Sequence, residues 1–501
     1  MSEASKQFQN LINSGAPVGE VLSINSFLIW VRGLQPVTLH ALIAFEDGSS
    51  GFVREILPDR VLVMHLGDPR HLRTGSLAVV QTPQIMARVG KDYIGRVVSV
   101  LGEPLDGKGV IAPDGSWPIF NQAPAIFERE LLSDQLETGV VSIDALFPIV
   151  RGQRMAMLGD SKSGKTTLAT QIAINQKNTD QTVIYVLVAK RRSDVDSLIN
   201  RLSENGAMEK SIVIVSTVFE SLVLSYLAPY IGCAMGEYLW QQIGTDVLVI
   251  YDDLTAHAQA HREISLLAGV SPGRDSYPGD MFHAHSSLLE RAGRLARNKK
   301  CLTCIPIVMA DSGDITAYLP TNIMSITDGQ WILDMDVFRE GIRPAVNTGL
   351  SVTRVGDRGH NDRQKRQAGD TLKLLGAYSQ AKEFAHFGSE LSSDAQRDMI
   401  RGTKVRALFS QIPGETYNLI SQQLMLDILL DQNSASKVDV AQLKKMIVQS
   451  SSLVKSDDSY QHLLDHIRGE LGLPPAAAAA PPVSRPAQQA PPPSVPAGGA
   501  Q

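Results

Sequence analysis

The stretch GDSKSGKTT, residues 159–167, decides the fold of this chain. It follows the apolar run MAML and precedes KTTLATQIAINQ, whose apolar residues recur at helical spacing. The pattern G-x4-G-K-T between a strand and a helix is typical of a P-loop, whose backbone N–H groups turn inward around phosphates. The stretch therefore predicts a nucleotide cradle, formed by Gly159, Asp160, Ser161, Lys162, Ser163, Gly164, Lys165, Thr166 and Thr167.

Two side chains of this loop and one distant carboxylate have the chemistry of a magnesium–nucleotide site. Lys165 would reach the β- and γ-phosphates, and the Thr166 hydroxyl would bind Mg²⁺. A P-loop also needs a carboxylate at the end of a neighbouring strand, and the run DVLVIYDD supplies Asp252 and Asp253. Asp252 is the better candidate because it ends the apolar run, although helix capping is the alternative for either aspartate.

The segments on both sides of the P-loop predict a multidomain protein. Short β-like runs punctuated by turn residues, from Gly19 to about Thr82, favour a small β-barrel. Apolar strands alternating with amphipathic helices predict an α/β domain with a mostly parallel sheet around the P-loop. Helical patterns follow, and the Pro/Ala-rich end lacks the apolar residues to fold. The predicted ranges are 1–84 for the barrel, 85–362 for the P-loop domain, 363–473 for a helical bundle and 474–501 for a disordered tail.

Composition narrows the class of protein further. The 501 residues are 43% hydrophobic and 20% charged, and the formal net charge of −5 gives no reason to expect a nucleic-acid partner. The N-terminus has neither the apolar core of a signal peptide nor the pattern of a transit peptide. Cys301 and Cys304, in KCLTCIPIVM, would point to opposite faces of a strand, so we expect buried strand cysteines and no shared metal.

The residues after the run TVIYVLVA indicate that the nucleotide is held and not cleaved. This run is expected beside the P-loop strand, where a catalytic site would place a carboxylate that activates water. The chain instead continues with Lys190, Arg191, Arg192 and Ser193. A lysine is charged at neutral pH and cannot accept a proton.

Several longer stretches resemble the α subunits of F-type rotary ATP synthases. They include ETGVVSIDALFPIVRGQRM, LAPYIGCAMGEYL, SPGRDSYPGD, HSSLLERAGR, YLPTNIMSITDGQ and GIRPAVNTGLSVTRVG, and the likeness spans most of the chain, from about Gly19 to about Leu473. The resemblance implies a hexamer of alternating α and β subunits around a central rotor stalk, the γ subunit. It further implies contacts with the peripheral stalk, indirect coupling to a membrane ion-translocating sector, and a place at the cytoplasmic face of a bacterial plasma membrane.

The same resemblance implies roles for individual residues. The α sites of this family bind ATP or ADP without turnover, and catalysis at the β sites is completed by an α arginine, which corresponds to Arg354 in GLSVTRVG. Ser351 and Ser325 are expected near that shared interface. The residues expected to border the adenine are Arg343, Pro344 and Gln411, and the loop SPGRDSYPGD is expected to surround the rotor unless it is a plain surface loop.

Departures from the family pattern raise specific questions. The family usually has GQKRS where this chain has AKRRS, so that Lys190 replaces a glutamine and could contact phosphate or repel Mg²⁺. After Gln411 the family's second glutamine is displaced by IPGE, and the chain has Thr353 where serine is usual. These changes, with the short N-terminal extension and the Pro/Ala tail, suggest a divergent bacterial branch such as the alternative sodium-translocating type.

Two other functions compete with a non-catalytic α subunit. The first is a self-sufficient homohexameric P-loop ATPase motor, similar to termination factor Rho or an export ATPase. The second is a nucleotide-binding structural protein without a rotary role. Lys190 and the α-like stretches argue against the motor, and a functional Arg354 would exclude the structural protein.

Overall fold

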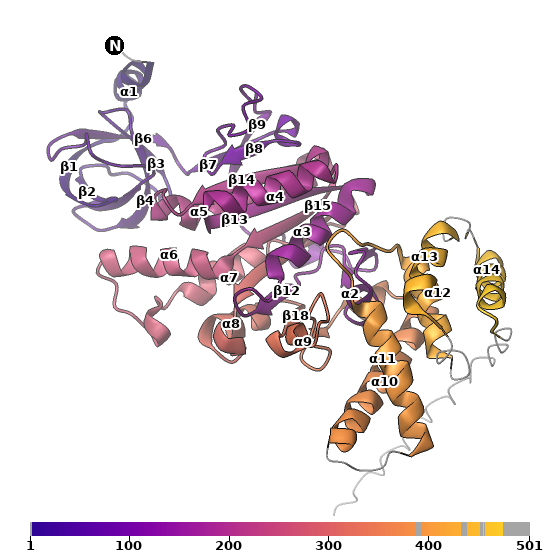
Figure 1. Cartoon of the computed structure of the whole chain (residues 1–501). Helices are drawn as coiled ribbons and strands as arrows, with labels where there is room; N and C mark the ends of the chain where they lie inside the picture. The colour runs from indigo at the N-terminus through magenta and orange to yellow at the C-terminus, as the bar shows by residue number, and fades with distance from the viewer. Residues whose placement is uncertain (1–2, 387–391, 432–437, 451–453, 455, 474–501) are drawn as a thin grey trace, which may run out of the picture. The chain divides into compact units, whose positions relative to one another are not determined.

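The computed structural model of the chain describes residues 3–386, 392–431, 438–450, 454 and 456–473 (Figure 1). The chain divides into two compact units, Met1–Ser451 and Ser452–Gln501. The first unit holds the barrel, the P-loop domain and the helices up to residue 450, and the second holds a single described helix, α14 (Asp457–Glu470). The tail predicted at 474–501 lies outside the described residues.

The first part of the chain forms the predicted β-barrel. Its six strands close in the order β1-β2-β5-β4-β3-β6. Alternate residues point inward, and Ile29, Val31, Val53 and Val63 are fully buried in the barrel core. Burial of such a side chain contributes about 1.5–3 kcal/mol to folding. A short helix, α1 (Glu3–Asn13), precedes strands β1 (Val18–Asn25), β2 (Leu28–Arg32), β3 (Leu42–Phe45), β4 (Ser50–Ile56), β5 (Val61–His65) and β6 (Leu77–Thr82).

Nine strands form the central sheet, which runs β19-β18-β12-β17-β15-β13-β14-β8 with β16 paired to β17. All its pairings are parallel except β18 with β19 and β16 with β17, which confirms the prediction of a mostly parallel sheet. The strands are β8 (Val97–Ser99), β12 (Ala156–Gly159), β13 (Gln181–Lys190), β14 (Ser211–Thr217), β15 (Asp246–Asp252), β16 (Gly293–Arg294), β17 (Cys301–Met309), β18 (Gly329–Leu333) and β19 (Val352–Thr353).

The order of these strands corrects one expectation. The run TVIYVLVA, now part of β13, does not lie beside the P-loop strand β12, because β17 and β15 come between them. Its neighbours are β14 and β15. Sequence order does not give the order of strands in a parallel sheet, since each crossover helix can place the next strand on either side.

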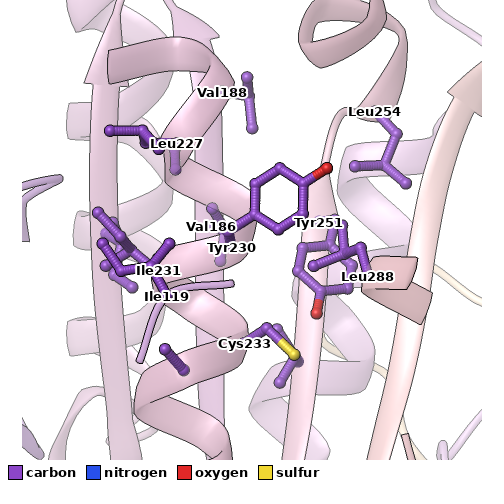
Figure 2. Close-up of a cluster of buried hydrophobic side chains, with 14 of the residues drawn as sticks. Ile119, Val186, Val188, Leu227, Tyr230, Ile231, Cys233, Tyr251, Leu254 and Leu288 are labelled. Atoms are coloured by element: carbon purple, nitrogen blue, oxygen red, sulfur yellow. The ribbon is translucent and has the colours of Figure 1, made fainter. Parts of the chain in front are cut away.

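Two groups of helices cover the sheet. Helices α3 and α4 pack against each other and on the sheet, whereas α5, α6, α7 and α8 pack among themselves and on its strands. Figure 2 shows part of the second layer, where Tyr230 and Cys233 of α5 lie close to Val186 of β13 and Tyr251 of β15. These helices are α3 (Lys165–Asn175), α4 (Arg192–Glu204), α5 (Leu222–Tyr238), α6 (Leu254–Leu267), α7 (Met281–Leu289) and α8 (Tyr318–Ile326), and a further short helix, α9 (Met335–Arg339), follows β18 in sequence.

Smaller elements join these parts. Strands β7 (Met86–Val89) and β9 (Gly115–Pro118) pair with each other, as do β10 (Gln135–Leu136) and β11 (Ile149–Val150), and α2 (Val141–Leu146) lies between the latter two in sequence. The remaining short turns of helix are η1 (Lys91–Tyr93), η2 (Ile126–Glu128), η3 (Gln176–Asn178), η4 (Met208–Lys210), η5 (Leu239–Ile243), η6 (Arg274–Ser276), η7 (Asp311–Gly313) and η8 (Gly356–Gly359).

Helices follow the sheet domain, as predicted. They are α10 (Asp362–His386), α11 (Ser393–Phe409), α12 (Leu419–Leu430) and α13 (Val440–Ser450), and α10, α11 and α12 contact one another. The side chain of Ser392 accepts a hydrogen bond from the backbone of α11, and that of Asn418 caps α12 in the same way. Domain boundaries at residues 84 and 362 stay predictions. No helix within the described ranges is both long and apolar enough to cross a membrane.

The prediction of buried strand cysteines is confirmed. Cys301 and Cys304 are both buried on β17, and Cys233 is buried on α5. Burial raises the pKa of the Cys233 thiol to about 11, so this thiol stays protonated at neutral pH. All three therefore pack as small apolar groups.

Candidate nucleotide-binding site

The predicted cradle forms at the carboxyl end of β12. The strand ends at Gly159, the loop turns through Lys162 (φ +62°) and Gly164 (φ +98°), and helix α3 begins at Lys165. A Cβ atom at Gly159 would lie 2.7 Å from the Leu333 carbonyl oxygen, so this position requires glycine. The buried Ser163 hydroxyl has no partner among the described residues, as expected of a group that faces a ligand.

Lys165 folds back on its own loop. Its Nζ donates to the carbonyl oxygens of Gly159 (2.8 Å) and Asp160 (2.6 Å). Burial lowers the pKa of this ammonium, and the nearby carboxylates of Asp253 and Asp252 oppose that shift. A polyphosphate in the loop would offer the ammonium charged acceptors in place of two neutral carbonyls.

The structure separates the roles of the two aspartates. Asp252, at the end of β15, has a side chain only 1% exposed, and its Oδ2 accepts from Thr166 Oγ1 (3.1 Å) and from the Tyr185 hydroxyl (3.2 Å). The Asp253 side chain caps helix α6 by accepting from the Ala256 N–H (2.7 Å). The pairing of Thr166 with Asp252 brings together the two residues predicted to hold magnesium.

Lys190 occupies the same corner of the site. Its Nζ lies 2.6 Å from Asp252 Oδ1 and 3.4 Å from Asp253 Oδ2. Contact is possible because β13 neighbours β15, where Leu187 pairs with Asp252. Burial lowers the pKa of Lys190, but the two carboxylates outweigh burial and raise it, so the side chain stays an ammonium.

A magnesium ion fits this corner poorly. The donor types are suitable, since Thr166 and Asp252 supply a hydroxyl and a carboxylate. Asp252 Oδ1, however, is already held by an ammonium at 2.6 Å. A divalent cation whose water shell needs that oxygen would meet a like charge in the same place. The prediction of a magnesium site at Thr166 and Asp252 therefore conflicts with Lys190.

A pocket opens beside the loop. Its volume is about 290 Å³, and it unites the P-loop with segments more than 170 residues away in sequence. The Arg343 guanidinium stacks on the Phe338 ring at 4.2 Å. Gln411 is buried, and its amide is engaged by backbone groups of Val141, Gly139 and Glu415. The three predicted base-site residues, Arg343, Pro344 and Gln411, all line this cavity.

Gln171 lines the same cavity and was missed by the sequence reasoning. Its Oε1 accepts from the Gly414 N–H (2.7 Å), whereas its buried Nε2 has no partner within the described residues. A buried amide donor without a partner is costly unless a ligand satisfies it. Helical spacing could have revealed the residue, because Thr167 and Gln171 lie one turn apart on α3.

The predicted trans residues lie elsewhere on the sheet domain. Arg354 is exposed, and its guanidinium donates to the carbonyl oxygens of Thr327 (3.2 Å) and Met324 (3.5 Å), near the end of α8. No carboxylate in the described part of the chain forms an ion pair with it. Ser325, also exposed, lies on the same helix end. Ser351 is buried, and its Oγ accepts from the Ile332 N–H (3.0 Å).

The loop that the resemblance places around a rotor connects α6 to α7. Asp275 and Ser276 both adopt positive φ angles, and the Tyr277 ring stacks on Tyr318 with centroids 5.6 Å apart. Arg274 lies over the Tyr318 ring as well. The conformation of this loop therefore depends on left-handed backbone turns and on aromatic contacts with α8.

Comparison with known proteins identifies relatives over nearly the whole chain. Residues 139–353 match the family model described as ATP synthase alpha/beta family, nucleotide-binding domain, and residues 363–478 match ATP synthase alpha/beta chain, C terminal domain. ATP synthase subunit alpha of Caldanaerobacter subterraneus subsp. tengcongensis is 38% identical over 93% of this chain and 92% of its own length. The same subunit of Thiobacillus denitrificans is 37% identical over 90% and 89%, and that of Dictyoglomus turgidum is 38% identical over 91% and 89%.

Proposed function

The chain belongs to the ATP synthase alpha/beta family as an F-type alpha subunit, and we propose that it binds nucleotide without cleaving it and completes a neighbour's catalytic site. In this role it is part of the enzyme's catalytic head. Its own site has the regulatory or structural function, and a beta subunit performs the chemistry.

The cradle and the base pocket support nucleotide binding in this chain. Helix α3 begins at Lys165, and no side chain caps its first N–H groups, which leaves them as donors for phosphate oxygens, while the Lys165 ammonium supplies a positive charge. Arg343, Pro344 and Gln411 border a cavity of suitable size for a purine. ATP and ADP are the proposed ligands.

Lys190 supports the absence of turnover. Hydrolysis needs a group that orients or polarises the attacking water. The residue that meets Asp252 at the end of the adjacent strand is an ammonium, which donates hydrogen bonds and accepts no proton. Asp253, the other carboxylate in this corner, is engaged with Lys190 and with the α6 backbone.

One observation carries the proposal that Arg354 acts in trans. Arg354 follows β19 at the amino end of β18, whereas the P-loop lies at the carboxyl end of the same parallel layer. Arg354 therefore lies at the opposite end of these strands from the P-loop, and its guanidinium is exposed and held only by carbonyl oxygens among its described contacts. A guanidinium in that state can enter a neighbouring subunit and stabilise charge on a transferring phosphoryl group.

The experiment that tests this proposal is ATP hydrolysis by the complex of this chain with its beta subunit. Arg354→Ala should lower the rate by about 10³-fold or more, the effect typical of arginine fingers. The matched control is Arg397→Ala, which removes an exposed arginine of α11 paired with Asp394. Native rates in the Arg354→Ala complex would refute the trans role.

The proposed assembly is an alternating hexamer of alpha and beta subunits around a central gamma stalk, with a peripheral stalk attached. Ser325 and Ser351 are proposed to lie near the alpha–beta contact, and the loop between α6 and α7 near the rotor. The complex is proposed to couple ATP synthesis or hydrolysis to proton or sodium transport at the cytoplasmic face of a bacterial membrane. The self-sufficient homohexameric motor is not favoured, because the relatives quoted above are alpha subunits.

A further inference from the structure

Both oxygens of the Asp252 carboxylate are held by side chains of this chain. Lys190 Nζ holds one oxygen at 2.6 Å, and the hydroxyls of Thr166 and Tyr185 donate to the other at 3.1 and 3.2 Å. Asp252 is 1% exposed, so no bulk water replaces these partners. In a P-loop site this carboxylate normally accepts from the water shell of Mg²⁺. Here an ammonium already fulfils that requirement.

The position of Lys190 is built into the sheet. The register between β13 and β14 shifts between Leu187 and Lys190, and Ala189 in this bulge has φ +50°. A left-handed conformation costs a residue with a Cβ about 1–2 kcal/mol. The bulge turns the chain so that the Lys190 side chain, 19% exposed, reaches back to the end of β15.

Charge in this corner leads to the same conclusion. Two ammonium groups, Lys165 and Lys190, balance the carboxylates of Asp252 and Asp253. With a neutral residue at position 190 these groups would carry one more negative than positive charge, which would oppose a polyphosphate unless a divalent cation offset it. Lys190 supplies that missing positive charge from the chain itself.

We propose that Lys190 replaces magnesium as the counter-charge of this site, so that the chain binds metal-free ADP or ATP. The inference rests on the proposed nucleotide-binding function and specifies the form of nucleotide that the site takes. Its consequence is that occupancy of this site follows the total adenine nucleotide concentration and not the magnesium-bound fraction. Lys190 is thus the residue that determines specificity between the two forms.

The test is isothermal titration calorimetry of the full chain with ADP, in excess EDTA and in excess Mg²⁺. The native chain should bind ADP with affinities that agree within about threefold between the two conditions, because a charge-assisted pairing is already present. Lys190→Gln should bind about 10- to 100-fold more weakly in EDTA and recover with Mg²⁺. Lys190→Arg, which keeps the charge, should resemble the native chain.

A second measurement reports the metal directly. With Mn²⁺ as the probe and ADP present, electron paramagnetic resonance should detect protein-bound Mn²⁺ in Lys190→Gln and little in the native chain. Lys373→Gln, which removes a lysine 83% exposed on α10, is the control for loss of a positive charge. Thermal unfolding of each variant confirms that the fold is intact.

The outcomes separate this inference from the function on which it rests. If the native chain binds ADP only with Mg²⁺, as Lys190→Gln does, the inference is wrong and the nucleotide-binding function stands. If the native chain binds no ADP in either condition, both are wrong. If the native chain binds ADP without metal, and this binding is lost in Lys190→Gln but kept in Lys190→Arg, the result supports both the inference and the nucleotide-binding function.

Discussion

Arg354 and Lys165 lie at opposite ends of the same parallel strands. Thr353 pairs with Gly329 at the start of β18, whereas Gly159, which precedes the loop of Lys165, pairs with Leu333 at its end. Strands rise about 3.3 Å per residue, so these ends are separated by about 13 Å. One chain therefore presents its P-loop at one end of these strands and an exposed guanidinium, held only by carbonyl oxygens among its described contacts, at the other.

This separation predicts that nucleotide binding by the chain is independent of the arginine. Lys165→Ala should weaken ADP binding by the isolated chain about 10- to 100-fold, because a charge-assisted contact to phosphate is lost. Arg354→Ala should leave the same affinity within about twofold, and titration calorimetry measures both. Equal losses in the two variants would mean that Arg354 reaches its own site, and the trans assignment would then be wrong.

The sequence predicts the individual motifs of this site better than the contacts between them. The P-loop and Asp252 were predictable because each follows an apolar strand, and the carboxyl ends of parallel strands share one edge of the sheet. The contact of Lys190 with Asp252 was not predictable, since it depends on β13 lying beside β15. Strand order is set by the three-dimensional packing of crossover helices, which local patterns do not encode.

The cavity proposed for the base shows a second limit of prediction from the sequence. Arg343, Pro344 and Gln411 were placed there by resemblance to a family and not by physical reasoning. Gln171 has no such motif, and only its place one turn after Thr167 indicates that it faces the loop. Side chains that converge from distant segments become visible only when the fold brings these segments together.

Ala189 provides a prediction about stability. Its φ of +50° is strained for alanine, so Ala189→Gly should relieve about 1–2 kcal/mol in the native state. Glycine also gains freedom in the unfolded chain, which offsets about 0.5–1 kcal/mol. We expect a net rise of about 0.5 kcal/mol in the free energy of unfolding, measured by urea denaturation.

The control for this change is Ala377→Gly, in the middle of helix α10. There the native backbone is helical, so glycine should lower the free energy of unfolding by about 1 kcal/mol. A loss of stability of that size in Ala189→Gly would show that the left-handed bend is not a source of strain.

Buried histidines predict a loss of stability in acid. His257 and His285 are buried beside each other, with Nδ1 and Nε2 3.3 Å apart. Burial lowers the pKa of His257, and burial and the nearby His261 lower the pKa of His285 to about 3. The unfolded chain binds these protons near pH 6.5, so folding opposes protonation. Stability should therefore be fully present above about pH 6.5 and fall as the pH drops below it.

Urea midpoints measured between pH 8 and pH 5 test this dependence. Each histidine held neutral contributes a slope of up to about 1.4 kcal/mol per pH unit below its unfolded pKa. His285→Gln should remove one such contribution and flatten the curve, even if it lowers stability at every pH. His71→Gln, at an exposed position, should leave the slope unchanged. A slope unaffected by His285→Gln would contradict the burial of a neutral imidazole.

A further prediction is that the Gln171 side chain donates a hydrogen bond to the bound nucleotide base. Its Nε2 lacks a partner in the described chain, and its Oε1 holds the loop that contains Gly414. Gln171→Glu keeps an acceptor for the Gly414 N–H and replaces the donor with a second oxygen. We expect this change to weaken ADP binding about 2- to 12-fold, the effect of losing one hydrogen bond to a purine nitrogen.

Inorganic tripolyphosphate distinguishes base recognition from damage to the cradle. It occupies the P-loop without a base, so Gln171→Glu should change its affinity only slightly, through the added negative charge. Gln171→Leu removes both the donor and the acceptor for the Gly414 N–H. It should weaken ADP binding further, because the loop that lines the pocket also loses this hydrogen bond. If Gln171→Glu weakens the binding of tripolyphosphate and of ADP equally, the substitution affects phosphate binding. The prediction that the Gln171 amide donates to the base would then be wrong.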